Sequence, residues 1–458
     1  MRTRGCGWGQ TRKKEGGGRD AAVFFICFSQ PLICLTHATQ PQEMSGEYVL
    51  GIDLGGTAAK LGLIPLATLL EPPSPPAAAS SSPPPPLPPP PFMHRAPLPL
   101  ARADRTPTAI VALLVDACGE LLAQAGIGWE AVEAVGVGFP GHVKEGGTVA
   151  AGAANLSEEW KAGVPLVKLL KEGLKAYIGG GQMILPEHIP STIVLLNDAD
   201  AALAAEAWGG AAQGHEDVVM LTLGTGIGVA VWLNGQAWSG SRGLVEGGHM
   251  VVAKGGRACG CGQQGCLEMY ASATALVHRA KELGFVRRRK GRREGLGREA
   301  DAGGGEDEER KKASARKEEE GREEEEGKGQ REQDDDNIDD DGSVLNAKHI
   351  FDAAFSSQPD PLALQVVEEA ADYLGLGCLN LCRVLDPAMV LFAGGMSGAG
   401  PRFVDMVKER FGAYGWSILP HDVEMGIAAL GGEQAGVWGS ARAAVVRRRK
   451  VRRARRSS

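Results

Sequence analysis

The stretch that decides the fold is residues 48–64, YVLGIDLGGTAAKLGLI. Its two apolar runs, Tyr48–Ile52 and Lys60–Ile64, flank a glycine turn and therefore predict two strands joined by a tight turn. Farther along the chain, short apolar runs alternate with helically spaced segments, which favours a layered α/β fold. Helices are predicted at 108–125, 199–208 and 362–385, and further strands at 132–137, 192–196, 218–223, 228–233 and 389–393.

The turn inside this stretch, residues 53–57, has the composition of a phosphate-binding loop. Gly55 and Gly56 have no Cβ, so their backbone N–H groups can approach phosphate oxygens closely. Asp53 stands at a strand end, where its carboxylate can hold Mg²⁺ directly or through water, and Thr57 adds a hydroxyl donor. The turn does not have the Walker A spacing, and an ordinary glycine-rich hairpin is the alternative interpretation.

A second glycine turn, LTLGTGIG at residues 221–228, repeats this pattern of strand, glycine and threonine. Thr225 and Gly226 are its candidate phosphate contacts. Two such turns in one chain predict two lobes that hold phosphates from opposite sides. A third cluster, FAGGMS, again follows an apolar run, and its Gly394 and Gly395 are candidates to lie against an adenine or ribose.

Two carboxylates follow the predicted strand 192–196, in the sequence LNDAD at residues 196–200. Asp198 or Asp200 is suited to cap the helix that starts here. In the functional interpretation one of them is a general base, because phosphoryl transfer to an alcohol needs a carboxylate within hydrogen-bond reach of the hydroxyl.

The most specific signal is a group of three cysteines within eight residues, CGCGQQGC at 259–266, with His249 ten residues before the first of them. Cys259, Cys261 and Cys266 supply three thiolates and His249 an imidazole, which together complete a tetrahedral Zn²⁺ shell. No open coordination position is evident, so the ion is predicted to be structural. Free buried thiols are the alternative.

The 458 residues carry a net charge of −7 and are 43% hydrophobic, which indicates a globular protein and gives no sign of specific nucleic-acid binding. Nine cysteines are too few for a disulfide scaffold, and a thiolate metal site suits a reducing compartment, so we expect a cytoplasmic protein. No run of about 18 apolar residues is found, so no membrane-spanning helix is predicted. His142, His188 and His215 have no evident partner and are predicted to be exposed loop residues.

Four segments depart from the α/β pattern. Residues 1–46 are basic and glycine-rich, and indicate either a targeting peptide for a plastid or mitochondrion or translation that starts at Met44. Residues 71–99 are dominated by proline, serine and alanine, and residues 287–341 by charge runs, so both are predicted to be disordered inserts. The arginine-rich tail from Arg447 is interpreted as a disordered extension in preference to a nucleic-acid contact or localisation signal.

Taken in order, these motifs resemble the ROK family (repressor, open reading frame, kinase), specifically its glucokinase-like sugar kinases. The resemblance covers residues 47–70, 106–286 and 343–440 and implies an actin-like ATPase (ribonuclease H-like) fold, in which two α/β lobes close over a central cleft. The implied domains are a small lobe at 47–197, a large lobe at 198–433 with the zinc loop 246–268, and a C-terminal helix at 434–458 that returns to the small lobe.

The resemblance also implies roles for individual residues. Asp198 matches the catalytic base that activates the 6-hydroxyl of the sugar, and His249 matches a residue that serves both zinc and sugar. The other implied sugar ligands are Asn155, Asn197, Glu246 and Glu268. The ATP phosphates are implied to lie against Asp53, Gly55, Gly56, Thr57, Thr225 and Gly226, and the adenosine against Gly394 and Gly395.

The activity implied is ATP-dependent phosphorylation of a hexose at its 6-hydroxyl, with glucose as the first candidate, Mg²⁺ bound with the ATP, and a homodimer or other homo-oligomer. N-acetylmannosamine, N-acetylglucosamine, mannose and fructose stay open as alternative sugars. A non-catalytic sugar-responsive regulator is an alternative of a different class. Residues 1–46 are too short and glycine-rich for a helix-turn-helix module, and the intact Asp53 and Asp198 favour catalysis. One departure from the family is that the proline-rich insert replaces part of the strand pair after Leu63.

Overall fold

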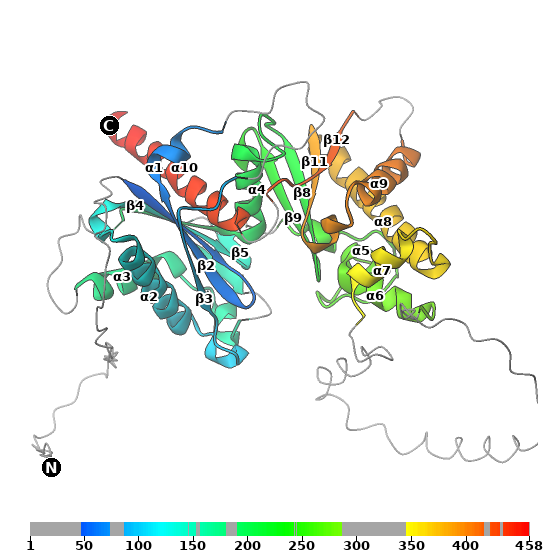
Figure 1. Cartoon of the computed structure of the whole chain (residues 1–458), viewed down its shortest axis with the longest axis horizontal. Coiled ribbons are helices and arrows are strands. Elements are labelled where there is room, and N and C mark those ends of the chain that lie inside the picture. The colour runs from blue at the N-terminus through cyan, green and yellow to red at the C-terminus, as the bar shows by residue number, and fades with distance from the viewer. Residues whose placement is uncertain are drawn as a thin grey trace, which may run out of the picture. The chain divides into compact units, whose positions relative to one another are not determined.

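The computed structural model describes parts of the compact unit Met44–Ser458. The described residues are 47–73, 87–144, 146–152, 156–179, 190–241, 243, 245–285, 345–415, 422–430 and 434–457. They form two five-stranded sheets and a separate two-stranded ribbon (Figure 1). Each large sheet has its own hydrophobic core, so the α/β layering predicted from the sequence is confirmed.

The first sheet has the strand order β3-β2-β1-β4-β7. Its antiparallel side is formed by β1, β2 and β3, whereas β4 and β7 run parallel to β1. This mixture follows from the connections, because a tight turn joins β1 to β2 and a helical crossover leads from β4 to β7. The strands are β1 (Tyr48–Leu54), β2 (Ala58–Pro65), β3 (Phe92–Pro97), β4 (Val132–Phe139) and β7 (Thr192–Asn197).

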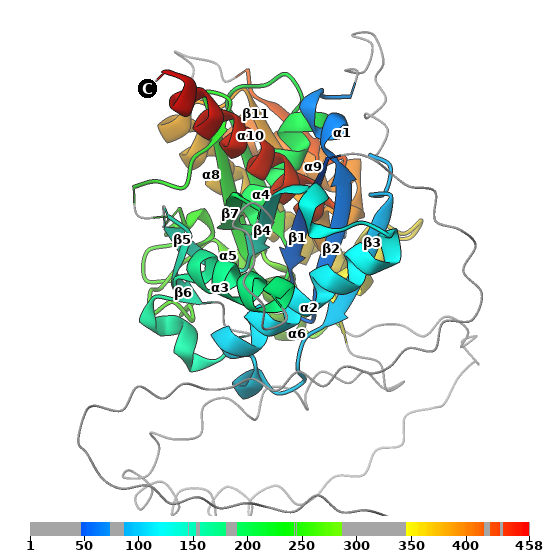
Figure 2. The same cartoon turned by 90° about the vertical axis from the view of Figure 1, so that its left-hand side faces the viewer.

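The two faces of β1 are covered by different helices, as the two-residue period of a strand requires. Leu50 and Ile52 belong to the core shared with α2 (Pro107–Ala125) and α3 (Leu166–Gly179). Figure 2 shows these two helices together on one side of the sheet. Val49 points to the opposite face, where it packs with α10 (Ala435–Ser457).

Helix α10 approaches the first sheet unusually closely, because glycines leave the contact surface bare. A Cβ on Gly51 would overlap the carbonyl oxygen of Val437, and a Cβ on Gly439 would overlap that of Ala201 in α4 (Asp198–Gly209). The backbone N–H of Ile52 donates to the hydroxyl of Ser440 at 3.1 Å across this contact. Helices α10 and α4 therefore lie packed together against the sheet (Figure 1).

The second sheet has the order β10-β9-β8-β11-β12, in which β8, β11 and β12 are parallel. Its core is shared with helices α5 to α9, which follow in the second half of the chain. The elements are β8 (Val218–Leu223), β9 (Ile227–Leu233), β10 (Gln236–Ala237), β11 (Met389–Ala393), β12 (Glu424–Ile427), α5 (Glu268–Ala271), α6 (Ala273–Glu282), α7 (Ala347–Ala354), α8 (Pro361–Leu385) and α9 (Pro401–Ala413). Other elements of the described residues are α1 (Leu66–Leu70), β5 (Gly141–Lys144), β6 (Thr148–Gly152) and several short 3-10 helices.

A buried carboxylate on α4 fixes the chain where it passes from β12 to α10. Glu206 is 1% exposed. Its oxygens accept the backbone N–H groups of Ala211 at 2.7 Å, Ala429 at 3.1 Å and Leu430 at 2.7 Å. A carboxylate satisfied by several backbone donors can stay buried, so Glu206 links the second sheet to the helix that covers the first.

Two predictions made from composition need correction. Within the proline-rich region 71–99, β3 pairs in register with β2, so a strand is found where part of the insert was expected, and residues 74–86 lie outside the described residues. The arginine-rich tail is helical to Ser457, because it continues α10, and its Arg448 forms an ion pair with Glu133. Helix α2 is long and apolar enough to span a membrane by length and composition, but Ile110, Leu114 and Leu121 are buried in the first core, so the expectation of no spanning helix is not overturned. The charged insert 287–341 lies outside the described residues.

The close approach of α10 to α4 predicts opposite effects for two glycine-to-alanine changes inside helices. Gly439→Ala would lower the free energy of unfolding by about 1–3 kcal/mol, because the added methyl group overlaps the α4 backbone. Gly412→Ala in α9 is the matched control, since a Cβ there meets nothing within 4 Å. It should stabilise by about 0.5–1 kcal/mol. Urea unfolding curves measure both, and equal effects would contradict the close packing.

Candidate active site

The parallel strands of the first sheet end at one edge and place their polar residues there. Asp53 of β1 is paired with Gly138 of β4, and Phe139 is paired with Asn197 of β7. The residues after these strands therefore meet in space although they are distant in sequence. The carboxyl ends of parallel strands are the usual place for a ligand in α/β proteins.

Asn197 caps helix α4 and also fixes the neighbouring loop. Its side-chain oxygen accepts the N–H of Ala199 at 2.9 Å and that of Asp200 at 3.4 Å. Its amide nitrogen donates to the carbonyl oxygen of Gly141 at 3.1 Å. The cap position thus belongs to Asn197 and not to Asp198 or Asp200, which corrects the capping alternative drawn from the sequence.

Asp198, the first residue of α4, has an environment that makes its carboxylate more basic than usual. Burial raises the pKa from 3.8 to about 6, and the negative charge of Asp53 acts in the same direction. The hydrogen bond from the N–H of Ala199, at 2.9 Å, opposes this effect. The group is still ionised at neutral pH, yet it is basic enough to accept a proton from a hydroxyl.

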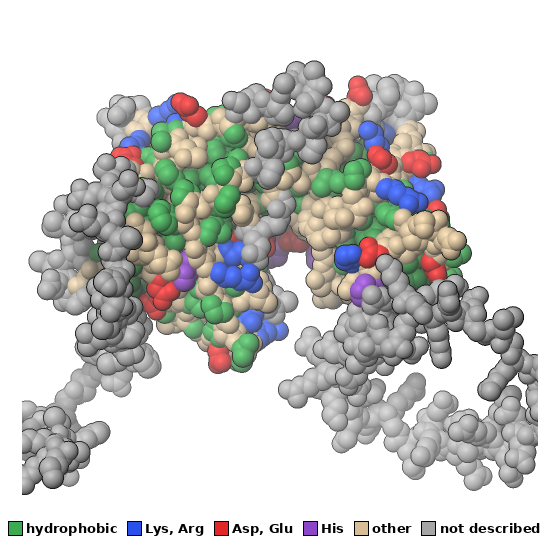
Figure 3. All heavy atoms as spheres, in the orientation of Figure 1, with side chains coloured by type: hydrophobic (Ala, Val, Ile, Leu, Met, Phe, Trp, Pro, Cys, Tyr) green, Lys and Arg blue, Asp and Glu red, His purple; other side chains and the backbone are tan. Residues whose placement is uncertain are grey.

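A cavity of about 630 Å³ opens beside Asp198 between the two large sheets. Figure 3 shows acidic and histidine side chains gathered in the hollow there. Eight residues predicted from the sequence line this cavity: Asn197, Asp198, Thr225, Gly226, Glu246, His249, Glu268 and Gly394. The structure therefore brings together sugar, phosphate and adenosine candidates from four separate motifs.

Glu268 is hydrogen-bonded to the second glycine turn. Its Oε2 accepts the N–H of Ile227 at 2.9 Å, and a Cβ on Gly226 would overlap the same oxygen. Gly394 is held at φ +86°, where a Cβ would meet the carbonyl carbon of Leu223 at 2.9 Å. Glycine is thus required at position 394, whereas a Cβ at position 226 would displace the carboxylate of Glu268 that lies next to the turn.

Five predicted phosphate or nucleotide residues do not line the cavity, namely Asp53, Gly55, Gly56, Thr57 and Gly395. The N–H of Gly55 is already donated to the carbonyl oxygen of Ala58 at 3.0 Å. Asp53 accepts from Lys60 at 3.4 Å and acts on the cavity through its charge at Asp198. The predicted sugar ligand Asn155 lies outside the described residues.

Four polar residues of the cavity were given no role by the family resemblance: His142, Asp200, Thr222 and Ser239, of which Asp200 was an alternative to Asp198 as the general base. His142 was expected to be an exposed loop residue, but its Nδ1 lies 3.3 Å from Oε1 of Glu246. The hydroxyl of Ser239 donates to Asp200 at 2.6 Å. Position in the chain offered a signal for His142, because it lies in β5 three residues after the end of β4, but its partner comes from a distant loop.

The three cysteines and His249 form a compact set of potential metal ligands. The nitrogen and sulfur atoms of His249, Cys259, Cys261 and Cys266 all lie within 4.8 Å of one another. Nδ1 of His249 is 3.6 Å from Sγ of Cys259, and Sγ of Cys261 is 3.6 Å from Sγ of Cys266. Ligands of a tetrahedral zinc ion are separated by roughly 3.4–3.8 Å, so this set fits Zn²⁺.

Comparison with known proteins agrees with this geometry. A glucokinase of Halalkalibacterium halodurans is 32% identical over 257 residues, which span 56% of this chain and 64% of that protein. A glucokinase of Streptomyces coelicolor is 30% identical over 395 residues, or 86% of this chain and 96% of the relative. The crystal structure of a ROK family glucokinase from Streptomyces griseus in complex with glucose and AMPPNP is 27% identical, with a TM-score of 0.53 over 86% of this chain and 98% of its own.

The two sheets and the cavity between them define a protein of the actin-like ATPase fold, as predicted from the motifs. The chain belongs to the ROK family, whose model matches residues 98–447. The family resemblance drawn from the glycine turns and the cysteine loop is therefore confirmed.

The raised pKa of Asp198 predicts a stability change that is separate from any activity. The folded state holds the proton more tightly than the unfolded chain, so the free energy of unfolding falls as pH rises from about 4 to about 6. Asp198→Asn removes this penalty and should stabilise the protein at pH 7–8 by on the order of 1–3 kcal/mol, with a smaller gain at pH 4. Urea unfolding at both pH values measures it, with the exposed Asp405→Asn as control. A variant less stable than the parent at pH 8 would contradict the assigned environment.

Proposed function

We propose that this protein transfers the γ-phosphoryl group of ATP to the 6-hydroxyl of a hexose, and that glucose is the preferred sugar. The observation that carries the proposal is the position of Asp198. It is a carboxylate with a pKa near 6, and it lines one cavity together with Glu246, His249, Glu268 and the Thr225–Gly226 turn. The three similar proteins named above are all called glucokinases, which supports the same reaction.

Asp198 acts as the general base in this reaction. Its carboxylate accepts the proton of the sugar hydroxyl while the oxygen attacks the γ-phosphorus, and the leaving group is ADP. Asn197 holds α4 in place through its two cap bonds, so that Asp198 meets the sugar from a rigid helix. Closure of the two lobes over the bound substrates is proposed to exclude water, which would limit hydrolysis of ATP without transfer to sugar.

The nucleotide is proposed to lie along the second sheet. Thr225 and Gly226 are proposed to hold its phosphates, and Gly394, which lines the same cavity, is proposed to lie against the adenosine. Asp53 is proposed to hold the Mg²⁺ that accompanies ATP, directly or through water. The bare backbone of Gly55 is less suited to phosphate than the sequence indicated, because its N–H is already paired within the turn.

The sugar is proposed to lie against the loop that carries Glu246 and His249. A zinc ion bound by His249, Cys259, Cys261 and Cys266 would fix this loop structurally. Nδ1 of His249 faces the sulfurs, which leaves Nε2 as the ring nitrogen for the sugar. His142 pairs with Glu246 and orients its carboxylate toward the cavity.

Two alternatives are tested with the same protein. N-acetylmannosamine, N-acetylglucosamine, mannose and fructose are the competing sugars. The competing class is a regulator without catalysis, which the relatives named xylose repressors raise. Asp198 distinguishes the classes, because a regulator needs sugar binding but does not need a basic carboxylate at the hydroxyl.

A coupled assay of ADP release over a panel of hexoses tests the activity. Glucose should give the highest kcat/KM, and Asp198→Asn should lower kcat by about 10²–10⁴-fold with a small change in KM, since the amide keeps its hydrogen bonds but cannot accept the proton. No ADP release with any of the sugars, or full activity in Asp198→Asn, would refute the proposal.

The pH profile tests the role of Asp53 in setting the basicity of Asp198. Activity should fall below about pH 6, where Asp198 becomes protonated. Asp53→Asn removes a negative charge that raises this pKa, so the acid limb of kcat/KM should move to lower pH even if the maximum rate falls. An acid limb that stays in place or moves to higher pH would argue against electrostatic coupling of the two carboxylates.

The metal prediction links zinc to sugar affinity. Cys261→Ser should lower the zinc content of the purified protein and raise the KM for the sugar together, because the loop that holds His249 loses its constraint. Elemental analysis and steady-state kinetics measure the two quantities, and Cys378→Ser on α8 serves as a cysteine control outside the cluster. Unchanged KM and kcat after complete loss of zinc would show that the ion does not brace the site.

A further inference from the structure

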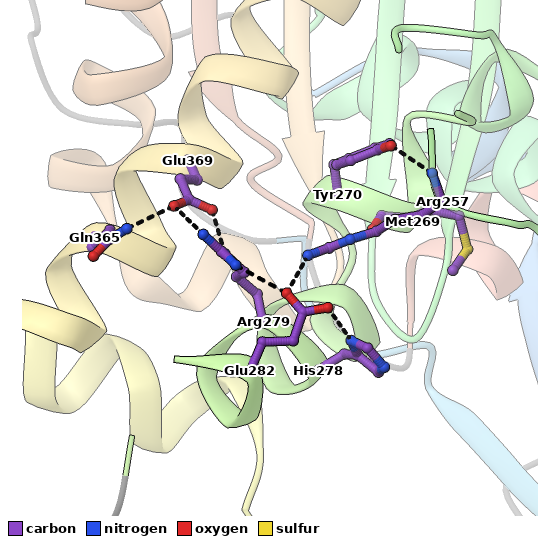
Figure 4. A network of polar contacts seen from close by, with 8 residues as sticks. All are labelled: Arg257, Met269, Tyr270, His278, Arg279, Glu282, Gln365 and Glu369. Carbon is purple, nitrogen blue, oxygen red and sulfur yellow. Dashed lines mark hydrogen bonds and ion pairs between the residues drawn. The ribbon is translucent and has the colours of Figure 1, made fainter. Parts of the chain in front are cut away.

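Arg257 lies in the loop between His249 and Cys259, two residues before the first cysteine of the cluster. Its guanidinium group leaves the loop and contacts two other elements (Figure 4). Nη1 donates to the carbonyl oxygen of Met269 in α5 at 3.0 Å, and Nη2 pairs with Oε2 of Glu282 at the end of α6 at 2.7 Å. One side chain therefore joins the cysteine loop to two helices.

The backbone of the same residue is fixed as well. The N–H of Arg257 donates to the hydroxyl of Tyr270 at 2.7 Å, and its carbonyl oxygen accepts the N–H of Gly265 at 2.8 Å. The guanidinium carbon lies 5.2 Å from the centre of the Tyr270 ring, which stacks on Tyr373 of α8 at 4.2 Å. The loop is thus held by an aromatic pair in addition to its ion pair.

The acidic partner is anchored in turn to α8, as Figure 4 shows. Glu282 accepts a second bond from Arg279 at 3.0 Å. Arg279 donates two hydrogen bonds to the carboxylate of Glu369, at 2.6 and 2.9 Å. Hydrogen bonds from Arg279 hold the pKa of Glu369 below its usual value. These paired bonds distinguish the network from an isolated surface ion pair, which contributes little.

The network reaches the cavity through the first turn of α5. Met269 and Tyr270, the two partners of Arg257 there, directly follow Glu268. Glu268 lines the cavity and holds the N–H of Ile227 in the second glycine turn. Arg257 therefore connects the loop of metal-ligand candidates to the helix that carries a cavity carboxylate.

We propose that Arg257 is a positioning residue, which holds the cysteine loop and the Glu268 helix in one fixed arrangement so that His249 and Glu268 face the sugar together. The inference rests on the proposed function for its kinetic consequence, but its effect on metal retention does not depend on activity. A lysine can replace Arg257 only in part, because a single ammonium group does not provide the planar fork that reaches Met269 and Glu282 at once.

The experiment compares Arg257→Ala and Arg257→Lys with a matched control, Arg402→Ala. Arg402 also combines a ring contact with a carbonyl contact, since it lies 4.4 Å from the centre of the Phe355 ring and 3.5 Å from the Phe355 carbonyl oxygen. It touches neither the cysteine loop nor α5 through these contacts. The probes are Zn²⁺ itself, followed by its transfer to a chromogenic chelator, and glucose in steady-state kinetics of the full chain.

In Arg257→Ala, zinc transfer should be about tenfold faster and the KM for glucose about tenfold higher than in the parent, while kcat changes little. Arg257→Lys, which keeps the charge and the fold, should show the same two effects at smaller size. Arg402→Ala should leave both at parental values. Glu282→Gln combined with Arg257→Ala should add little to the single change, because both act through one contact.

The inference is overturned if both Arg257 variants match Arg402→Ala in zinc transfer and in KM. It is also overturned if kcat falls and KM stays unchanged, since Arg257 would then act on the chemical step. If the parent protein releases no ADP with any sugar, the proposed function fails, and zinc transfer alone decides the role of Arg257. If the parent binds no zinc, the metal proposal fails, and the comparison of KM values alone decides the role of Arg257.

Discussion

The parallel pairing of β1, β4 and β7 is the constraint on which the site depends. It fixes Asp53 beside Gly138, and Phe139 beside Asn197, so that the ends of three strands meet at one edge of the sheet. A shift of one residue would turn the side chains of a strand to the opposite face. The negative charge that raises the pKa of Asp198 comes from across this edge, so register and reactivity are linked.

The second half of the site is built on the opposite sheet and is held to the first through α4 and α10. Gly439 allows these two helices to touch, and Glu206 fixes the chain between β12 and α10. The cavity is therefore lined from both sheets, with the carboxylates Asp198 and Glu268 contributed by different halves. In the proposed reaction this arrangement brings a base on one sheet to a phosphoryl group held by the other.

Much of the fold was predictable because its strands are short, continuous apolar runs bounded by glycine, and the structure confirms each strand and helix predicted from such a run. Strand β3 was missed because FMHRAP lies in a proline-rich region and half of its positions are polar or proline. Spacing identified the cysteine cluster, since its ligands are local in sequence. The His142–Glu246 contact could not be predicted, because it depends on how two distant loops meet.

The central claim is that Asp198 meets the hydroxyl that receives the phosphoryl group. A crystal structure of the protein with glucose and a non-hydrolysable ATP analogue tests it most directly. The account predicts the 6-hydroxyl oxygen within about 2.6–3.2 Å of an Asp198 carboxylate oxygen, with the γ-phosphate on the opposite side of that oxygen. A sugar bound in the cavity with its 6-hydroxyl directed to Asp200 or to water, away from Asp198, would contradict it.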